Sequence, residues 1–74
     1  MELPRIDMKA TGERIRQARH HAGLTVAELQ DAMGFLNPDT IYKWQCGRSL
    51  PKIDNFVILA YLFGTTIDDL IVIE

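Results

Sequence analysis

The sequence predicts an all-α domain of five short helices. Apolar residues recur at helical spacing, glycines stand where helices should stop, and two Thr-x-x-acid patterns mark helix starts. Of the 74 residues, 47% are hydrophobic and 24% are charged, which is a globular rather than a disordered composition. We therefore expect one domain over 1–74, with a core of about 11–71 and an N-terminal arm of 1–10.

The first two helices are predicted from their ends. Thr11 is a good N-cap for a helix with apolar residues at helical spacing, and Gly23 is a suitable left-handed stop. Thr25 and Glu28 have the spacing of a capping box, in which each side chain binds the other residue's backbone N–H. They open a second helix that Gly34 ends.

The third helix is predicted over 38–46. Asn37 is a good N-cap, and Pro38 suits the first helical position because its missing N–H would be unpaired there. Helical spacing turns Ile41 and Trp44 inward.

The last two helices follow from similar signals. One is expected to start at Asp54 or a nearby residue and to end at Gly64. Thr66 and Asp69 form a second capping box, which opens a short final helix.

The two ends of the chain leave alternatives open. "LPRIDM" and "LIVIE" are β-rich and partly alternating, so a short β-ribbon joining the termini is one hypothesis. The other is a frayed N-terminus and one more helical turn at the C-terminus.

The distribution of charge matters more than the total of −2. The segment 9–52 contains seven basic and four acidic residues, a net charge of +3. All charged residues after this segment are acidic. We expect one basic and one acidic end, so the acidic total does not exclude a phosphate-binding surface.

Several classes of function are disfavoured. Cys46 is the only cysteine, so neither an internal disulfide nor a cysteine zinc site is expected. No apolar run has the length of a membrane span, and the first residues lack the order of a signal peptide, which favours a cytoplasmic protein. His20 and His21 are helix neighbours that point in different directions and are poor joint metal ligands. We find no catalytic constellation and predict no enzyme activity, cofactor, metal or small-molecule effector.

The motifs "GERIR", "GLT..EL", "G…TIYKW", "GRSLP" and "LA.LFG….DDL" occur in this order. Over roughly residues 11–71 the chain strongly resembles the Cro and phage-repressor type of helix-turn-helix domain, also called the XRE family, with its lambda-repressor-like fold. The resemblance implies that the third helix enters the major groove of double-stranded DNA and that two copies bind as a homodimer.

The resemblance also implies site residues. The base-contacting positions are Asn37, Pro38, Asp39 and Lys43. The phosphate-contacting positions are Arg19, Thr40, Arg48 and Lys52. Asp39 can accept a hydrogen bond from a cytosine amino group, although an acidic residue in a first helical turn is also a common surface charge.

Departures from the family pattern modify this expectation. Val26 stands where a phosphate-binding polar residue is usual, and Gln30 where a small residue is usual. The connection between the second and third helices is one residue longer, with Leu36 as the inserted residue. Gln45 replaces a common Glu, so its pair with Arg19 becomes at best a hydrogen bond and leaves that arginine freer to reach phosphate.

The fourth helix has more apolar surface than one buried face requires, which usually marks an interface. The expected dimer interface comprises Ile58, Tyr61, Leu62, Ile71 and Ile73. Alternatively, the N-terminal segment folds back and covers this surface through Leu3, Ile6 and Met8.

The sequence supports two functional hypotheses. One is a homodimeric, sequence-specific transcriptional regulator that binds double-stranded DNA. The other is a protein-interaction or antitoxin-like module with weak or lost DNA reading. Val26, Pro38 and Asp39 favour the module, and the basic segment favours the regulator.

Overall fold

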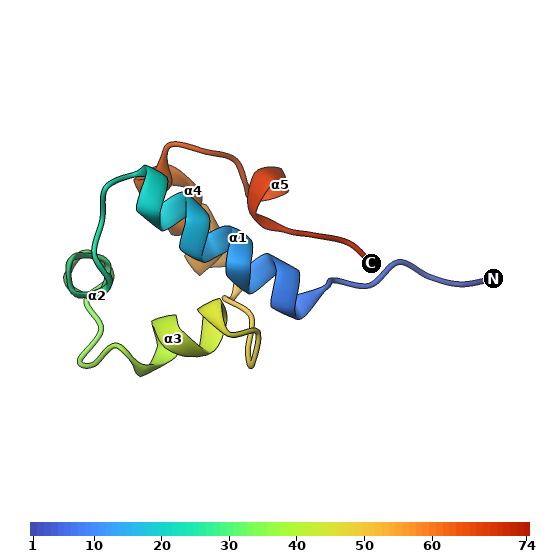
Figure 1. The fold of residues 1–74 in the computed structure, drawn as a ribbon, viewed down its shortest axis with the longest axis horizontal. Helices are drawn as coiled ribbons and strands as arrows, with labels where there is room; N and C mark the ends of the chain where they lie inside the picture. The colour runs from blue at the N-terminus through green and yellow to red at the C-terminus, as the bar shows by residue number, and fades with distance from the viewer.

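The computed structural model describes residues 1–74 and contains five helices. They are α1 (Met8–His21), α2 (Val26–Met33), α3 (Asp39–Gln45), α4 (Ile53–Phe63) and α5 (Ile67–Leu70). The all-α, five-helix prediction is confirmed. In Figure 1, α1 crosses the middle of the molecule with α3 below it and α4 behind it, and both termini lie at the right. None of the helices combines the length and the apolar character needed to cross a membrane.

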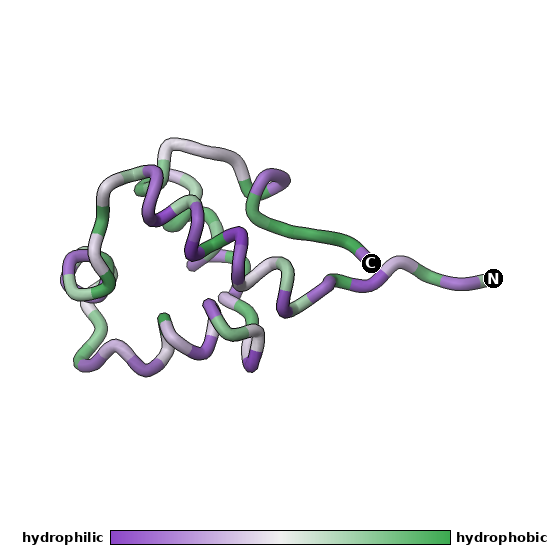
Figure 2. Tube along the Cα trace, in the orientation of Figure 1, coloured by the Kyte–Doolittle hydropathy of each residue, from purple (hydrophilic) through white to green (hydrophobic).

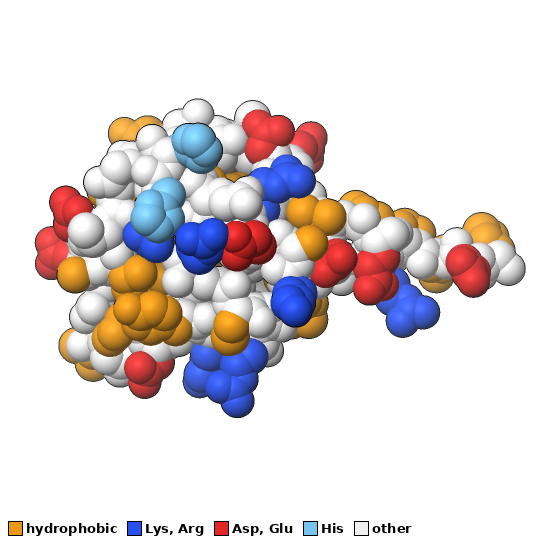
Figure 3. Space-filling model, in the orientation of Figure 1, with side chains coloured by type: hydrophobic (Ala, Val, Ile, Leu, Met, Phe, Trp, Pro, Cys, Tyr) orange, Lys and Arg blue, Asp and Glu red, His pale blue; other side chains and the backbone are white.

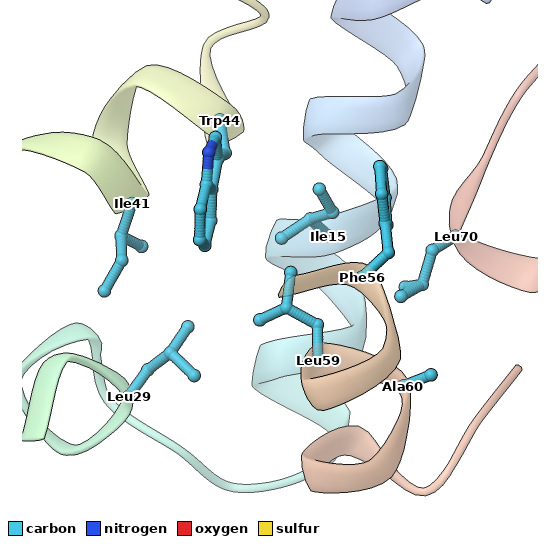
Figure 4. Packing of buried hydrophobic residues seen from close by; sticks show 8 residues of the cluster. All are labelled: Ile15, Leu29, Ile41, Trp44, Phe56, Leu59, Ala60 and Leu70. Atoms are coloured by element: carbon cyan, nitrogen blue, oxygen red, sulfur yellow. The ribbon is translucent and has the colours of Figure 1, made fainter. Parts of the chain in front are cut away.

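One hydrophobic core unites all five helices. Its buried members are Ile15, Leu29, Ile41, Trp44, Phe56, Leu59, Ala60 and Leu70. Their side chains converge between α1, α3 and α4 in Figure 4. Ile41 and Trp44 point inward from α3, as the sequence predicts.

The start of α1 differs from the expected cap at Thr11. The helix begins at Met8, and the Asp7 carboxylate caps it by accepting a hydrogen bond from the Ala10 amide at 2.9 Å. Thr11 is instead fully buried, and its hydroxyl accepts a hydrogen bond from the Val72 amide at 3.0 Å. The sequence interpretation was wrong here because it could not foresee that the C-terminal segment occupies this hydroxyl.

The chain ends are paired, but by less than a ribbon of two strands. A single antiparallel bridge joins Ile6 and Ile73, and the Glu74 amide donates to the Arg5 carbonyl at 2.9 Å. The residues after α5 are extended and do not add a helical turn. Figure 2 shows this apolar C-terminal segment running beside the N-terminal arm, whose first residues project away from the body.

The capping box of α2 is confirmed. The Thr25 hydroxyl accepts from the Glu28 amide at 3.1 Å, and the Glu28 carboxylate accepts from the Thr25 amide at 3.0 Å. The box of α5 is only half formed. Thr66 accepts from the Asp69 amide at 3.2 Å, whereas the Asp69 carboxylate accepts from the Thr65 hydroxyl at 2.9 Å.

Gly12 sets how closely α1 approaches α3. A Cβ at this position would lie 2.2 Å from the Trp44 carbonyl oxygen and 2.8 Å from that of Gln45. These are backbone atoms of α3 and its end, so they cannot move aside as a flexible side chain can. The close contact positions the third helix directly against the first.

Candidate nucleic-acid interface

The beginning of α3 is built by the segment Asn37–Asp39. The predicted helix over 38–46 is shorter, because Pro38 is the capping residue and Asp39 the first helical one. Asn37, the predicted N-cap, lies one residue before the observed one, and its Oδ1 accepts a hydrogen bond from the Asp39 amide at 3.0 Å. This bond uses the carbonyl half of the Asn37 side chain and leaves its NH2 group as a donor.

One face of α3 is open to solvent. Asp39, Thr40 and Lys43 are exposed, and Tyr42 is 53% exposed. The opposite face carries the two core residues described above, so the helix is fixed by its apolar side and presents its polar side. The exposed face includes three of the residues predicted to contact DNA.

An open hollow of about 490 Å³ borders this face. Its lining residues are Arg16, Asp39, Tyr42, Lys43, Gln45, Cys46 and Arg48. Three cationic side chains, from α1, α3 and the following loop, therefore line this hollow together with the Asp39 carboxylate. In Figure 3, the largest group of Lys and Arg side chains on the face shown lies at the lower edge, beside α3 and its following loop.

Arg16 is a site candidate that the sequence interpretation missed. Its guanidinium binds the Glu13 carboxylate, with Nε donating to Oε2 at 3.0 Å. This hydrogen bond lowers the pKa of Glu13 and raises that of Arg16. Both side chains are at the surface, where such a pair contributes little to stability. The i,i+3 spacing indicated the ion pair, but not its closeness to α3.

Arg48 and Lys52, which are predicted to contact phosphates, lie in different places. Arg48 lines the hollow, and its backbone amide donates to the Lys43 carbonyl at 2.9 Å, which holds the loop against the end of α3. Lys52 is exposed at the N-cap of α4 and does not line the hollow. The structure thus brings Lys43 and Arg48 together and leaves Lys52 apart.

Arg19 is not free to reach a phosphate, which corrects the sequence expectation. Only 8% of the residue is exposed. Its Nε donates to Gln45 Oε1 at 3.0 Å, as predicted, and its Nη1 donates to the Leu24 carbonyl at 2.7 Å. The replacement of Glu by Gln45 indicated only the loss of the ion pair, whereas the second acceptor, the Leu24 carbonyl, is defined by the folded chain. Arg19 ties α1 to the start of α2 and to α3.

The turn between α2 and α3 is anchored on both sides of Leu36. Gln30 Nε2 donates to the Phe35 carbonyl at 3.3 Å, and the Phe35 ring packs edge-on against Trp44 with ring centroids 5.7 Å apart. Leu36 itself is 98% exposed, as an inserted residue would be. Val26, which replaces a polar residue of the family, packs against the core.

The outer side of α4 is apolar and uncovered. Ile53, Val57 and Tyr61 form a stripe at i, i+4 and i+8, and Tyr61 is 84% exposed. Of the predicted interface residues, Ile58 and Ile73 are also exposed, whereas Leu62 and Ile71 are half-buried. The N-terminal segment does not cover this side, because its own Leu3 is exposed and the segment pairs with the C-terminus.

The arrangement of α2, turn and α3 on a five-helix core defines a helix-turn-helix domain. The helix-turn-helix family model HTH_3 matches residues 15–70, and the chain belongs to this XRE-type family. The fold is similar to that of the solved S. venezulae BldD DNA-binding domain, with a TM-score of 0.74 and 18% identity over 88% of this chain and 96% of that chain. A search of the curated proteins finds no match. The resemblance inferred from the motifs is confirmed.

Proposed function

We propose that this protein is a sequence-specific transcriptional regulator that binds double-stranded DNA as a homodimer, with α3 in the major groove. The observation that carries the proposal is the exposed polar face of α3 beside the cationic hollow, on a helix-turn-helix framework. An α-helix fits the major groove, where base edges differ, and cations around the helix neutralise the flanking phosphates.

The proposed contacts divide into two kinds. Lys43, the NH2 group of Asn37 and the carboxylate of Asp39 meet base edges, and Pro38 adds an apolar contact. Arg48, Lys52 and the Thr40 hydroxyl meet the sugar-phosphate backbone. Arg16 joins the second group if it exchanges Glu13 for a phosphate, since both partners are exposed.

The homodimer is proposed from the uncovered stripe on α4 together with the apolar C-terminal segment. Apolar surface of this kind in a small domain is better buried against a partner than exposed to water. A second copy would place two recognition helices about one turn of DNA apart. A DNA partner also supports the cytoplasmic location expected from the sequence.

Selection from random duplex DNA by the purified protein tests the proposal. A homodimeric regulator should enrich a palindromic motif whose half-sites are spaced by about one helical turn. If no sequence is enriched at low salt, the proposal of sequence-specific DNA binding is overturned. The exposed α4 stripe would then favour the alternative of a protein-interaction or antitoxin-like module on the same fold.

A further inference from the structure

We propose that Leu36, at the tip of the turn before α3, reads the C5 methyl group of a thymine in the major groove. The proposal rests on the proposed function and adds a specificity-determining residue to it. Leu36 is 98% exposed and directly precedes the segment that begins the proposed recognition helix. A single exposed leucine is common on protein surfaces, but the backbone on both sides of Leu36 is held in place.

The backbone before Leu36 is fixed by three contacts of one residue. The Phe35 amide donates to the Gln30 carbonyl at 3.1 Å, and the Phe35 carbonyl accepts from Gln30 Nε2 at 3.3 Å. The Phe35 ring also packs edge-on against Trp44 of α3. The inserted residue therefore follows an anchored position and does not belong to a loose loop.

The backbone after Leu36 is fixed as well. Asn37 Oδ1 accepts a hydrogen bond from the Asp39 amide, and Pro38 restricts its own φ angle, which is −85°. Because both neighbours are held, the backbone of Leu36 is fixed before binding, and only its side chain has to be ordered against DNA. Pre-organisation of this kind favours affinity, since a contact residue whose backbone is already ordered loses less entropy.

The apolar side chain of Leu36 points to an A·T pair read from its thymine side. A bidentate pair between asparagine and adenine uses both the carbonyl and the NH2 group of the side chain. Asn37 Oδ1 is turned toward the Asp39 amide, from which it accepts, so the side chain presents its NH2 group rather than both groups to a base. The thymine methyl is the one apolar feature that a base presents in the major groove, and an exposed leucine is a matching partner.

The test is a double-mutant cycle that combines a change in the protein with a change in the DNA. The DNA is the duplex enriched in the selection experiment. Each thymine of the half-site is replaced in turn by deoxyuridine, which removes only the methyl group. At one position the wild-type protein should lose about fourfold in affinity, the effect expected for one buried methyl group. Replacement in both half-sites should cost roughly fifteenfold. The Leu36→Ala variant should be insensitive to the same replacement.

Leu3→Ala is the matched control, since Leu3 is a 73% exposed leucine on the N-terminal arm. It should keep the wild-type sensitivity to deoxyuridine, and thermal unfolding should show that both variants are folded. The inference is overturned if Leu36→Ala keeps that sensitivity, or if it weakens thymine and deoxyuridine duplexes equally, as a sugar contact would. If the selection experiment enriches no duplex, both the proposed function and this inference are wrong.

Discussion

Asp39 places a negative charge where α3 would enter the groove, among the cations that line the hollow. In the proposed complex, a carboxylate there would repel phosphates and accept from a cytosine amino group at the correct site only, so it would act mainly by penalising wrong sites. We expect Asp39→Ala to tighten binding to random DNA and to reduce preference for the selected site by about 1–3 kcal/mol.

Both affinities for Asp39→Ala must be measured at one fixed salt concentration, because the phosphate contribution depends on salt. Asp39→Asn is the matched variant, since it keeps the size of the side chain while removing the charge. Unchanged affinity for random DNA together with unchanged preference would show that Asp39 is only a surface charge in the first turn of α3.

The packing around Gly12 decides whether Gly12→Ala stabilises or destabilises the fold. In an open helix, Gly→Ala stabilises by roughly 1 kcal/mol through helix propensity. Here the added Cβ meets backbone carbonyls of Trp44 and Gln45, so α1 and α3 must separate. We expect Gly12→Ala to destabilise the fold by about 1–3 kcal/mol, the usual cost of overpacking, as measured by urea unfolding.

The control for Gly12 is Ala27→Gly on the exposed side of α2, which measures propensity without a packing change. A more stable Gly12→Ala variant would mean that the two helices are not in close contact in solution.

At the scale of an element, the start of α2 should be sensitive to acid. The backbone N–H of Thr25, followed by its hydroxyl, lowers the pKa of the Glu28 carboxyl from its ordinary value of 4.5. A carboxyl with a lower pKa in the folded state stabilises the fold above its ordinary pKa, and this contribution is lost as the pH falls through the folded-state value. The capping box should therefore weaken below about pH 4.5.

Glu28→Gln isolates this titration, because glutamine can form the same capping box without a charge. The free energy of unfolding of the wild type minus that of Glu28→Gln should be largest near pH 7 and should shrink as the pH falls below 4.5. A difference that stays constant from pH 7 to pH 3 would contradict the assignment of the lowered pKa to this box.

At the scale of the whole molecule, the uneven charge distribution predicts a strong salt dependence. If Arg48 and Lys52 each neutralise one phosphate, a dimer releases roughly four counterions and the log–log slope of affinity against salt is about −4. Arg19 is excluded from this count because it is buried. Arg48→Ala should flatten the slope by about two units and weaken binding to all sequences alike. A loss confined to one DNA sequence would instead assign Arg48 to a base.

The proposed dimer is the second prediction at this scale. Tyr61 is the most exposed member of the α4 stripe, so Tyr61→Glu should give a folded monomer with much weaker operator binding, whereas Tyr61→Phe should remain dimeric. Sedimentation velocity at tens of micromolar, about the working range for a weak dimer, separates the two states. A wild-type protein that is monomeric under these conditions would show that the stripe has another use.

Local signals were sufficient for most of the framework. The number of helices, the box of Thr25 and Glu28, and the stops at Gly34 and Gly64 are all observed. These features depend on residues within three or four positions of one another, where steric and hydrogen-bonding rules act without the rest of the chain. The inward positions of α3 were predicted for the same reason, since they depend only on helical period.

Only the tertiary structure decided the contacts between distant residues. Thr11 is buried against the C-terminal segment, and Arg19 has a second acceptor beyond α1, so neither has the role expected from its local pattern. Arg16 lies beside α3 because Gly12 allows α1 and α3 to pack closely. In the sequence, the only sign of this close packing is the single glycine at position 12. The sequence by itself determined which segments are helical, since that is a short-range property. Which charges are free to face a partner depends on long-range packing, and it became defined only when the chain was folded.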